Sequence, residues 1–414
     1  MMRIDIATVR EQIAELDSFG KTAGGGTTRP SYSKAWRQGQ DYVRTLMTAA
    51  GMTVECDAIG NLIGTYPGTR SDLPYVMAGS HLDTVPEGGS LDGALGVIAA
   101  IACVHSWHAV GYRPSRTVKV VAFVEEEGSV FGVGCLGSRF MAGEMTMDKL
   151  SALHDKQGRL LADNLADNGM DVAALAGGGI NRQEIYAFLE LHVEQGYELD
   201  LAGEPCAIVT DIVGIDRHWI TVRGHANHAG TTRMDRRQDA LVAASCLVQE
   251  IYEAAHASGG AYVATIGKLQ VLPGATNVIP GQVDFTIETR AAHNSIMESV
   301  HHDIIARLQH SEARYGVTAA VESRHFSPAV SLGDAMVAEF ADAASELGLA
   351  VNKMPSWAGH DAKIMANITS CGMLFVPSVN GISHSPVEDT RWDDVAVGLQ
   401  LFNHTLRRVA SKES

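Results

Sequence analysis

The sequence lacks the features of a nucleic-acid-binding, membrane-spanning or disulfide-linked protein. Its formal net charge is −16, whereas a phosphate backbone requires a basic binding face. No uninterrupted apolar stretch is long enough to cross a bilayer. The six cysteines are scattered without a CxxC pair, which favours reduced thiols. The N-terminal MMRIDIATVREQIAELDSFG reads as an acid-bearing amphipathic helix without the apolar core of a signal peptide. These absences predict a soluble, cytoplasmic protein.

Length and composition indicate a folded protein with more than one domain. The 414 residues exceed a single typical core, so two domains are the default expectation. Hydrophobic residues make up 46% of the chain, with 42 glycines, 12 prolines and no low-complexity tract, as is typical of a globular enzyme. We predict one domain from residues 1–212 and 330–414, with a second domain inserted at residues 213–329.

Residues 1–212 alternate helix-like and strand-like segments, and this pattern resumes after residue 330. Such alternation predicts an α/β fold with a mainly parallel sheet, in which sites form beyond the carboxyl ends of the strands. We expect helices over 33–50, 95–108, 334–347, 361–367 and from 392, and strands over 61–66, 74–78, 117–124, 186–191 and 373–376.

The inserted segment has a different order of elements. Alternating or apolar runs predict strands over 216–223, 262–272, 282–290 and 317–323, and helical patterns cover 235–255 and 295–315. The resulting order β-α-β-β-α-β is that of a split-βαβ (ferredoxin-like) α+β domain. A sheet of this kind leaves an open edge strand, and pairing two such edges is a common way to cover them. We therefore expect a homodimer formed through the inserted lid and dimerisation domain.

Five residues of metal-binding type stand in strand-end or glycine-rich contexts: His81, Asp92, Glu127, His192 and His384. Mixed imidazole and carboxylate ligands suit zinc, manganese, cobalt or nickel, and such centres support hydrolysis. Asp92 lies in the turn GGSLDGALG, where a carboxylate can bridge two ions. An isolated HxD pair or acidic triplet is more often an ordinary surface feature. The five together favour a metal centre.

Two further acids are candidates for roles beside the metals. His81 and Asp83 point the same way on an extended strand end, so one can ligate while Asp83 orients its neighbours. Three adjacent carboxylates, at positions 125–127, would repel each other without cations nearby. Assigning Glu127 as a ligand and Glu126 as the general base resolves that conflict.

The order of these motifs resembles the di-zinc aminoacylase and carboxypeptidase clan. Within it, ELHVEQG, GHANHAGTTRMDRRQDAL, LPGATNVIPGQVDFTIETR, WAGHDA and GISHSPVED resemble the N-carbamoyl-L-amino-acid hydrolase, β-ureidopropionase and allantoate amidohydrolase family. The resemblance runs through nearly the whole chain. His192 stands where related peptidases commonly use a carboxylate, which favours the carbamoyl-type branch. Leu91, Arg233 and Trp357 depart from the family pattern and leave the exact substrate open.

The resemblance implies two divalent metal ions per subunit, one held by His81, Asp92 and His192 and the other by Asp92, Glu127 and His384. It implies that Glu126 deprotonates water and passes the proton to the leaving nitrogen. His228 would donate to the developing oxyanion, and Arg290 with Asn277 would hold the substrate carboxylate. Further substrate contacts are expected at Gln195, Arg217 and His360, although Gln195 can equally be a turn residue and Arg217 an exposed strand charge.

The expected function is hydrolysis of the ureido C–N bond of an N-carbamoyl L-amino acid, releasing ammonia and carbon dioxide. Allantoate amidohydrolase is the first alternative, followed by a dipeptidase or aminoacylase. A catalytically silent metal-binding protein is an alternative from another class, but it would have no need for a base such as Glu126. The expected substrate contacts both domains, so their closure would exclude water from the reaction.

Overall fold

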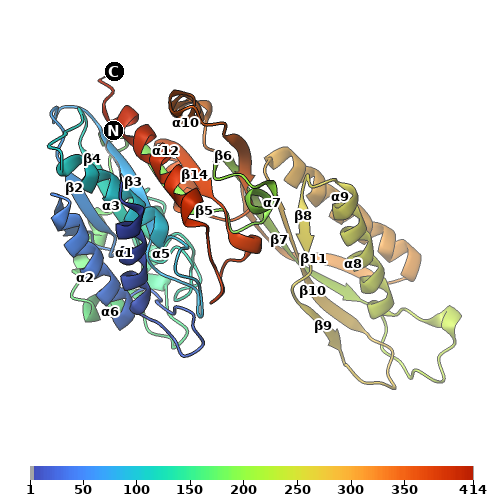
Figure 1. The fold of residues 1–414 in the computed structure, drawn as a ribbon. Helices are drawn as coiled ribbons and strands as arrows, with labels where there is room; N and C mark the ends of the chain where they lie inside the picture. Colours follow the sequence, from blue (N-terminus) through green and yellow to red (C-terminus); the bar gives the residue numbers. More distant parts are fainter. Residues whose placement is uncertain (1–3, 414) are drawn as a thin grey trace. The chain divides into compact units, whose positions relative to one another are not determined.

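The computed structural model describes residues 4–413, which divide into two compact units (Figure 1). The first unit runs to Thr210 and continues over Ser331–Met354 and from Ala358, and the second comprises Asp211–Val330 and Pro355–Trp357. The short return of residues 355–357 to the second unit is not evident from the sequence pattern. Among the described residues, no helix is both long and apolar enough to cross a membrane.

A nine-stranded sheet organises the first unit, in the order β1-β2-β4-β3-β5-β14-β6-β12, with β13 paired to β6. Its central strands β4, β3, β5 and β14 are parallel, and β1, β2 and β6 extend it with antiparallel pairs. The predicted α/β fold with a mostly parallel central sheet is therefore confirmed. The strands are β1 (Thr53–Cys56), β2 (Leu62–Tyr66), β3 (Tyr75–His81), β4 (Val118–Phe123), β5 (Ile185–Val193), β6 (Ala207–Ile212), β12 (Val330–Ser331), β13 (Asn352–Ser356) and β14 (Ser370–Val376).

Helices cover both faces of this sheet, as continuous apolar parallel strands require. One large core joins α1, α2, α3, α10 and α12 to the sheet, and α11 lies against β5 and β14 on the other side. Figure 1 shows α1, α3 and α12 in front of the strands. The helices are α1 (Ile6–Ser18), α2 (Lys34–Ala49), α3 (Ala94–His108), α4 (Leu136–Met141), α5 (Met147–Ala152), α6 (Leu161–Asp167), α7 (Glu198–Ala202), α10 (Asp334–Leu347), α11 (Asp361–Met365) and α12 (Trp392–Ala410).

The second unit is a five-stranded antiparallel sheet packed against two helices. Its order is β11-β7-β10-β8, with β9 also paired to β10. Alternation along β10 buries Val283, Phe285 and Ile287 beneath the helices, as predicted. The elements are β7 (Gly214–Arg223), α8 (Ala240–Ala257), β8 (Val263–Thr265), β9 (Leu269–Leu272), β10 (Gln282–Ala291), α9 (Asn294–Tyr315) and β11 (Thr318–Ser327).

Two expected boundaries in this unit are wrong. The helix expected from residue 235 begins at Ala240, because the Asp239 side chain accepts hydrogen bonds from the backbone N–H groups of Leu241 and Val242 and caps it there. Residues 234–236 form a separate 3₁₀ turn. The single strand expected over residues 262–272 is two strands, since β8 and β9 pair with different halves of β10.

Candidate metal centre

The carboxyl ends of three adjacent parallel strands bring the candidate residues together. His81 ends β3, the acidic run at 125–127 follows β4, and His192 stands near the end of β5. Asp92 precedes α3, whose N-cap Gly93 has a φ of +67° with its Cα facing the His81 ring. A Cβ at Gly93 would lie 2.4 Å from that ring, so the position requires glycine on grounds of both space and conformation.

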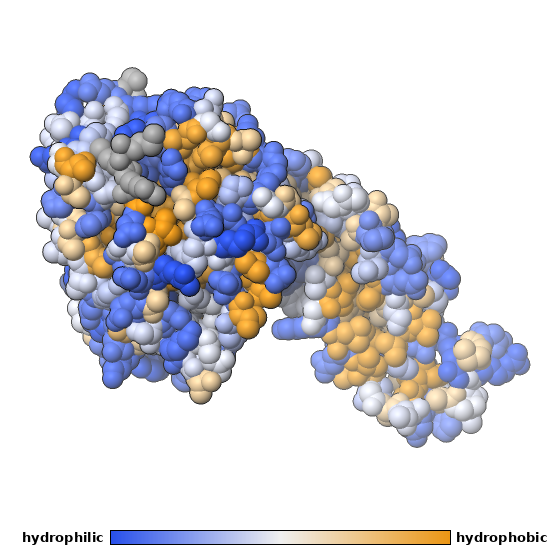
Figure 2. Space-filling view, in the orientation of Figure 1, coloured by the Kyte–Doolittle hydropathy of each residue, from blue (hydrophilic) through white to orange (hydrophobic). Residues whose placement is uncertain are grey.

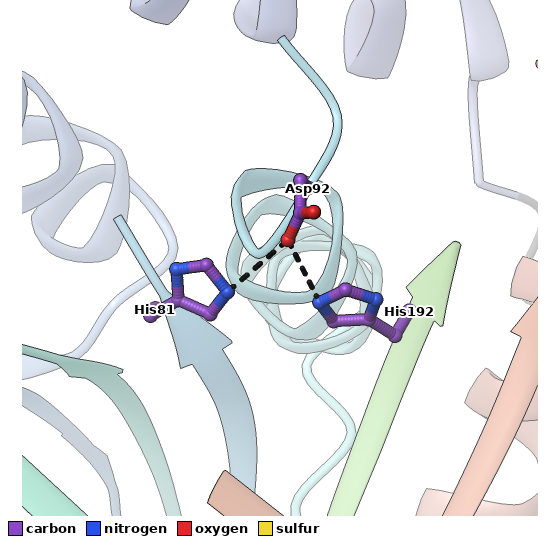
Figure 3. A group of neighbouring side chains, drawn as sticks. All are labelled: His81, Asp92 and His192. Atoms are coloured by element: carbon purple, nitrogen blue, oxygen red, sulfur yellow. Dashed lines mark ion pairs between the residues drawn. The ribbon is translucent and has the colours of Figure 1, made fainter. Parts of the chain in front are cut away.

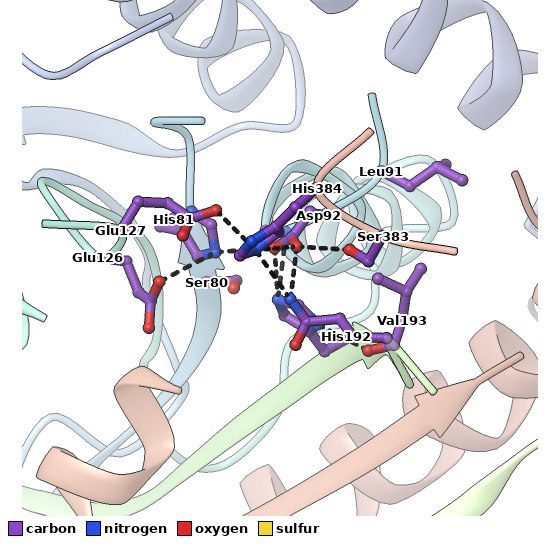
Figure 4. Close-up of polar contacts among 12 residues, drawn as sticks. Ser80, His81, Leu91, Asp92, Glu126, Glu127, His192, Val193, Ser383 and His384 are labelled. Atoms are coloured by element: carbon purple, nitrogen blue, oxygen red, sulfur yellow. Dashed lines mark hydrogen bonds and ion pairs between the residues drawn. The ribbon is translucent and has the colours of Figure 1, made fainter. Parts of the chain in front are cut away.

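Asp92 lies at the centre of the five predicted ligands and divides its two oxygens between them. Its Oδ1 is 3.3 Å from Nε2 of both His81 and His192 (Figure 3). Its Oδ2 is 3.2 Å from Nε2 of His384, which is in turn 3.3 Å from Glu127 Oε1 (Figure 4). The result is two groups of three donors that share one carboxylate. This is the arrangement that a carboxylate bridging two ions requires.

Hydrogen bonds to backbone carbonyls set the tautomers of the two buried histidines. His81 Nδ1 is 3.0 Å from the carbonyl of Asp83, and His192 Nδ1 is 2.9 Å from the carbonyl of Val193. A carbonyl only accepts, so each Nδ1 carries the proton and each Nε2 presents its lone pair. The backbone N–H of Gly93 donates to His192 Nε2 at 3.2 Å, consistent with that assignment. Both rings are therefore prepared as Nε2 ligands.

The charges of the centre are strongly coupled. Burial alone would raise the pKa of Asp92, but in the metal-free protein hydrogen bonds from the protonated imidazoles of His192, His384 and His81 hold it well below its usual value. Hydrogen bonds to Asp92 and Glu127 raise the pKa of His384 to about 10. When imidazole and carboxylate groups lie this close, the negative charge of the carboxylates is offset either by protons on the imidazoles or by a shared metal cation.

The donor set fits divalent metal ions. Two neutral imidazole nitrogens, a shared carboxylate, and a second carboxylate–imidazole pair are ligands of the kind that zinc and related transition metals accept. In each group of three, the donor atoms lie within 4.8 Å of one another. The structure therefore contains clusters that are able to hold metals at the positions expected from the sequence.

Asp83 organises the residues around the centre. It is fully buried, and its two oxygens accept the backbone N–H groups of Glu126 and Glu127, each at 3.1 Å. Its own carbonyl faces His81 Nδ1. Asp83 thus orients an imidazole and the acidic loop without facing the metal ligand atoms itself.

Glu126 lies beside the first group of donors, with Oε2 3.8 Å from His81 Nε2. Burial raises the pKa of Glu126 well above its usual value, His81 lowers it, and Glu127, Asp361 and Asp83 raise it further. The thiol of Cys135 lies 3.3 Å from Glu126 Oε1. A carboxyl group with a raised pKa next to the ligands has the position and proton affinity of a general acid–base.

Two supporting residues were not predicted. Glu388 Oε1 accepts the backbone N–H groups of Leu91 and Asp92, at 2.9 and 3.1 Å. The hydroxyl of Ser383 is 3.0 Å from Asp92 Oδ2 and 2.8 Å from Glu388 Oε2. Both residues lie inside the motif GISHSPVED. An acid and a hydroxyl close to His384 in that motif could have identified them from the sequence. Glu388 thus holds the backbone of Asp92, and Ser383 holds its carboxylate.

Gln195 and His360 lie at this centre, not in a separate pocket. The side-chain amide of Gln195 donates to Asp92 Oδ2 at 2.6 Å, and its backbone φ is +60°. That backbone conformation is typical of a turn residue, and the substrate contact expected at Gln195 stays a prediction. His360 is only 2% exposed and its ring packs edge-on against His192 with centroids 4.5 Å apart. That packing lets His360 support the His192 ring, and the substrate contact expected at His360 stays a prediction.

His228 and Asn277 lie next to each other in the second unit. The backbone carbonyl of Asn277 accepts the N–H of Ala229 at 3.0 Å, and His228 pairs with Val278 in an isolated bridge. His228 Nδ1 accepts the backbone N–H of Gly230 at 3.0 Å, so its Nε2 carries the proton. The exposed ring of His228 therefore presents an N–H donor, as a role at an oxyanion requires.

Arg217 and Arg290 are both paired with one residue that the sequence analysis did not single out. Glu288 Oε2 accepts from Nε and Nη2 of Arg217, and Glu288 Oε1 accepts from Nε and Nη2 of Arg290 at 3.0 and 2.8 Å. Arg290 Nη1 also donates to the Trp357 carbonyl at 3.0 Å. Glu288 therefore joins the two arginines into one group, and the substrate contact expected at Arg217 stays a prediction.

A mostly parallel sheet with imidazole and carboxylate donors clustered at its strand ends defines a hydrolase with a candidate metal centre. The chain belongs to peptidase family M20/M25/M40, which matches residues 77–408. Enzymes of this family typically use divalent metal ions, in agreement with the donor set.

Similar proteins narrow the reaction class. The chain is 36% identical to the N-carbamoyl-L-amino acid amidohydrolase of Geobacillus stearothermophilus over 97% of this chain and 98% of that protein. It is 34% identical to the allantoate amidohydrolase of Bacillus subtilis over 97% of each. An amidase of the hydantoinase/carbamoylase family from Burkholderia multivorans matches 100% of both chains with a TM-score of 0.92 and 30% identity. The protein is a hydrolase, and its relatives are named for activities on C–N bonds.

Proposed function

We propose that the protein hydrolyses the ureido C–N bond of N-carbamoyl L-amino acids. The observation that carries the proposal is the pair of three-donor groups sharing Asp92, with Glu126 3.8 Å from His81 Nε2. An ordinary amide or ureido bond needs both an activated water and a proton for its leaving nitrogen. Relatives named for carbamoyl amino acids support this choice of bond.

The proposed centre holds two divalent ions, one on His81, Asp92 and His192 and one on Asp92, Glu127 and His384. Such ions, when bound, polarise a carbonyl and lower the pKa of water. Zinc, manganese, cobalt and nickel all suit these donors.

The residues of the chain then supply proton transfer and binding. Glu126 takes a proton from water as the oxygen attacks the ureido carbon, and returns it to the leaving nitrogen. The Nε2–H of His228 stabilises the developing oxyanion. Arg290, with Asn277, holds the α-carboxylate. One water and one N-carbamoyl amino acid give the amino acid, carbon dioxide and ammonia.

Allantoate is the second candidate substrate, because the 34% identical Bacillus subtilis relative is named for it. Ammonia release should be measured from N-carbamoyl L-amino acids and allantoate, and amino-acid release from N-acetyl amino acids and dipeptides. We expect the highest kcat/KM on a carbamoyl amino acid. A higher kcat/KM on allantoate would transfer the assignment to allantoate. Hydrolysis of dipeptides or acetyl amino acids alone would contradict the proposal.

We also propose that the inserted domain, predicted as residues 213–329, forms a homodimer and serves as a lid. Within residues 4–413, strand β11 pairs only with β7, which leaves its other edge for a second chain. Apolar residues gather over α8 (Figure 2), where Val242 is 48% and Tyr252 64% exposed. We expect sedimentation to show a dimer at micromolar concentration. A fully active monomer would contradict this.

A further inference from the structure

The open face of the sheet in the second unit carries a pocket of about 720 Å³. On β7 and β10, side chains that point away from the helices alternate with the buried core residues. The register places Arg217 directly opposite Glu288, and Trp219 directly opposite Thr286. Arg290 and Trp357 complete this part of the lining. The pocket therefore places two arginines beside two tryptophans.

Glu288 holds the two guanidinium groups in a defined orientation. In each arginine it engages the edge formed by Nε and Nη2. A guanidinium has five N–H groups in a fixed plane, so each Nη2 retains a second N–H. On Arg290, Nη1 gives one N–H to the Trp357 carbonyl and retains another. Both arginines thus remain able to bind a further acceptor through N–H groups that Glu288 does not use.

Arg217, Arg290 and Glu288 together carry a net positive charge, which favours an anionic ligand. Burial would raise the pKa of Glu288, but hydrogen bonds from Arg217 and Arg290 lower it, so the carboxylate is ionised at neutral pH. Two guanidinium charges against the Glu288 carboxylate leave an excess of one positive charge, and Lys268, which also lines the pocket, adds another. A ligand carboxylate offsets part of this positive charge and matches the planar guanidinium donors.

The walls next to the arginines are apolar and accessible. Trp219 is 37% exposed and Val263 is 45% exposed, and both line the pocket together with Trp357. The guanidinium carbon of Arg217 lies 5.9 Å from the centroid of the Trp219 ring, so the charged and aromatic surfaces adjoin. An exposed and a half-buried tryptophan beside an unbalanced positive charge are suited to a ligand that is anionic at one end and apolar at the other.

We propose that this pocket binds a monocarboxylate bearing an aromatic or large apolar group, with Trp219 and Trp357 as specificity-determining residues and Glu288 as the positioning residue for Arg217 and Arg290. The inference rests on the proposed function and narrows its substrate to N-carbamoyl derivatives of aromatic or large apolar L-amino acids. Allantoate has no apolar group to occupy the tryptophan wall.

Calorimetry with simple acids tests the pocket without relying on turnover. 3-Phenylpropanoate should bind the holoenzyme about tenfold or more tightly than propanoate, because a buried aromatic ring contributes at least that factor. Trp219→Ala and Trp357→Ala should each weaken 3-phenylpropanoate binding severalfold and leave propanoate unchanged. Trp219→Phe should restore most of the loss. Val110→Ala, which truncates an exposed apolar side chain in the first unit, is the control and should change neither.

Turnover provides the second arm. The ratio of kcat/KM for N-carbamoyl-L-phenylalanine over N-carbamoylglycine should fall in both tryptophan variants through KM. The pocket assignment would be overturned if 3-phenylpropanoate and propanoate bound equally well to the wild type. It would also be overturned if the tryptophan variants lost the same affinity for both acids. If the acids bind as expected and no ureido compound is hydrolysed, the proposed reaction fails while the pocket stands.

Discussion

Replacing Glu126 by Gln should separate proton transfer from metal binding at the proposed centre. The two groups of donors do not include Glu126, whose Oε2 is 3.8 Å from the nearest ligand nitrogen. Glutamine has the same shape but cannot take a proton from water. We therefore expect metal content to stay unchanged while kcat falls about 10²–10⁴-fold, the usual contribution of a general base. That loss corresponds to about 3–5 kcal/mol in the activation barrier.

Glu127→Gln is the informative comparison, since it changes the adjacent carboxylate. Glu127 Oε1 lies 3.3 Å from His384 Nε2 and belongs to the second donor group. Losing this charge should reduce occupancy of one metal per chain, measured by elemental analysis after gel filtration. Activity should partly recover at high metal concentration, which cannot happen in Glu126→Gln. Glu11→Gln, at an exposed position on α1, controls for an unrelated change of charge.

Glu126→Gln should also change the stability of the metal-free protein. The pKa of Glu126 is raised, first by burial. A carboxyl group whose pKa is higher in the folded state destabilises the fold once pH exceeds its unfolded value of about 4.3. At neutral pH, metal-free Glu126→Gln should therefore melt at a higher temperature than the metal-free wild type. If Glu126→Gln and Glu127→Gln gave the same metal content and the same rate, the division of roles between them would be refuted.

Three further outcomes are expected. Chelation should abolish turnover, and adding back zinc, manganese, cobalt or nickel should restore it, whereas full activity in metal-free protein would contradict the proposed centre. Arg290→Ala should lower kcat/KM by a factor that corresponds to about 2 kcal/mol. This is the low end for truncating one partner of a charge pair, because the Arg290 side chain is 34% exposed. The loss should be smaller on ureido compounds without a carboxylate, and an equal loss on both kinds of substrate would mean that Arg290 is structural. Burial lowers the pKa of His218 to about 4. The contribution of the neutral His218 to the free energy of unfolding is therefore fully present above pH 6.5 and is lost as the pH drops toward 4, with a loss of about 1–2 kcal/mol at pH 5. Melting curves of His218→Gln should show a shallower dependence on pH over that range, and identical curves would rule out His218 as the titrating group.

Local patterns predicted much of the fold because they depend on neighbours in sequence. The apolar segment that became β4 and the small-residue helix α3 (Ala94–His108) both appear where expected. Strand β6 was missed because it pairs with β14, which is distant in sequence. Strand β1 was missed although it pairs with the neighbouring β2, because its four residues are mostly exposed and carry no apolar pattern. The start of α8 was misplaced because Asp235 and Asp239 are both plausible caps, and only the structure shows which side chain reaches the helix N–H groups.

The candidate site follows the same division. Strand-end positions of His81 and His192 could be predicted, because strand ends are readable from sequence and parallel strands end at one edge. The pairing of Glu288 with Arg290 was accessible, since residues two apart share one face of a strand. Its simultaneous pairing with Arg217 was not, because it depends on the register between β7 and β10. The burial of His360 against His192 likewise depends on how α11 packs on the sheet.

The contacts of Asp83 indicate that the proposed metal ligands and the proposed base cannot vary independently. Its carbonyl sets the tautomer of His81, while its carboxylate holds the backbone of Glu126 and Glu127. Burial raises the pKa of Asp83, and His81 opposes that rise. Replacing the Asp83 side chain would therefore release the backbone of the proposed ligand Glu127 and of the proposed base Glu126 at once. The pocket at Glu288 has its own supports on β7 and β10, so substrate preference can change there while the donors at the strand ends stay in place.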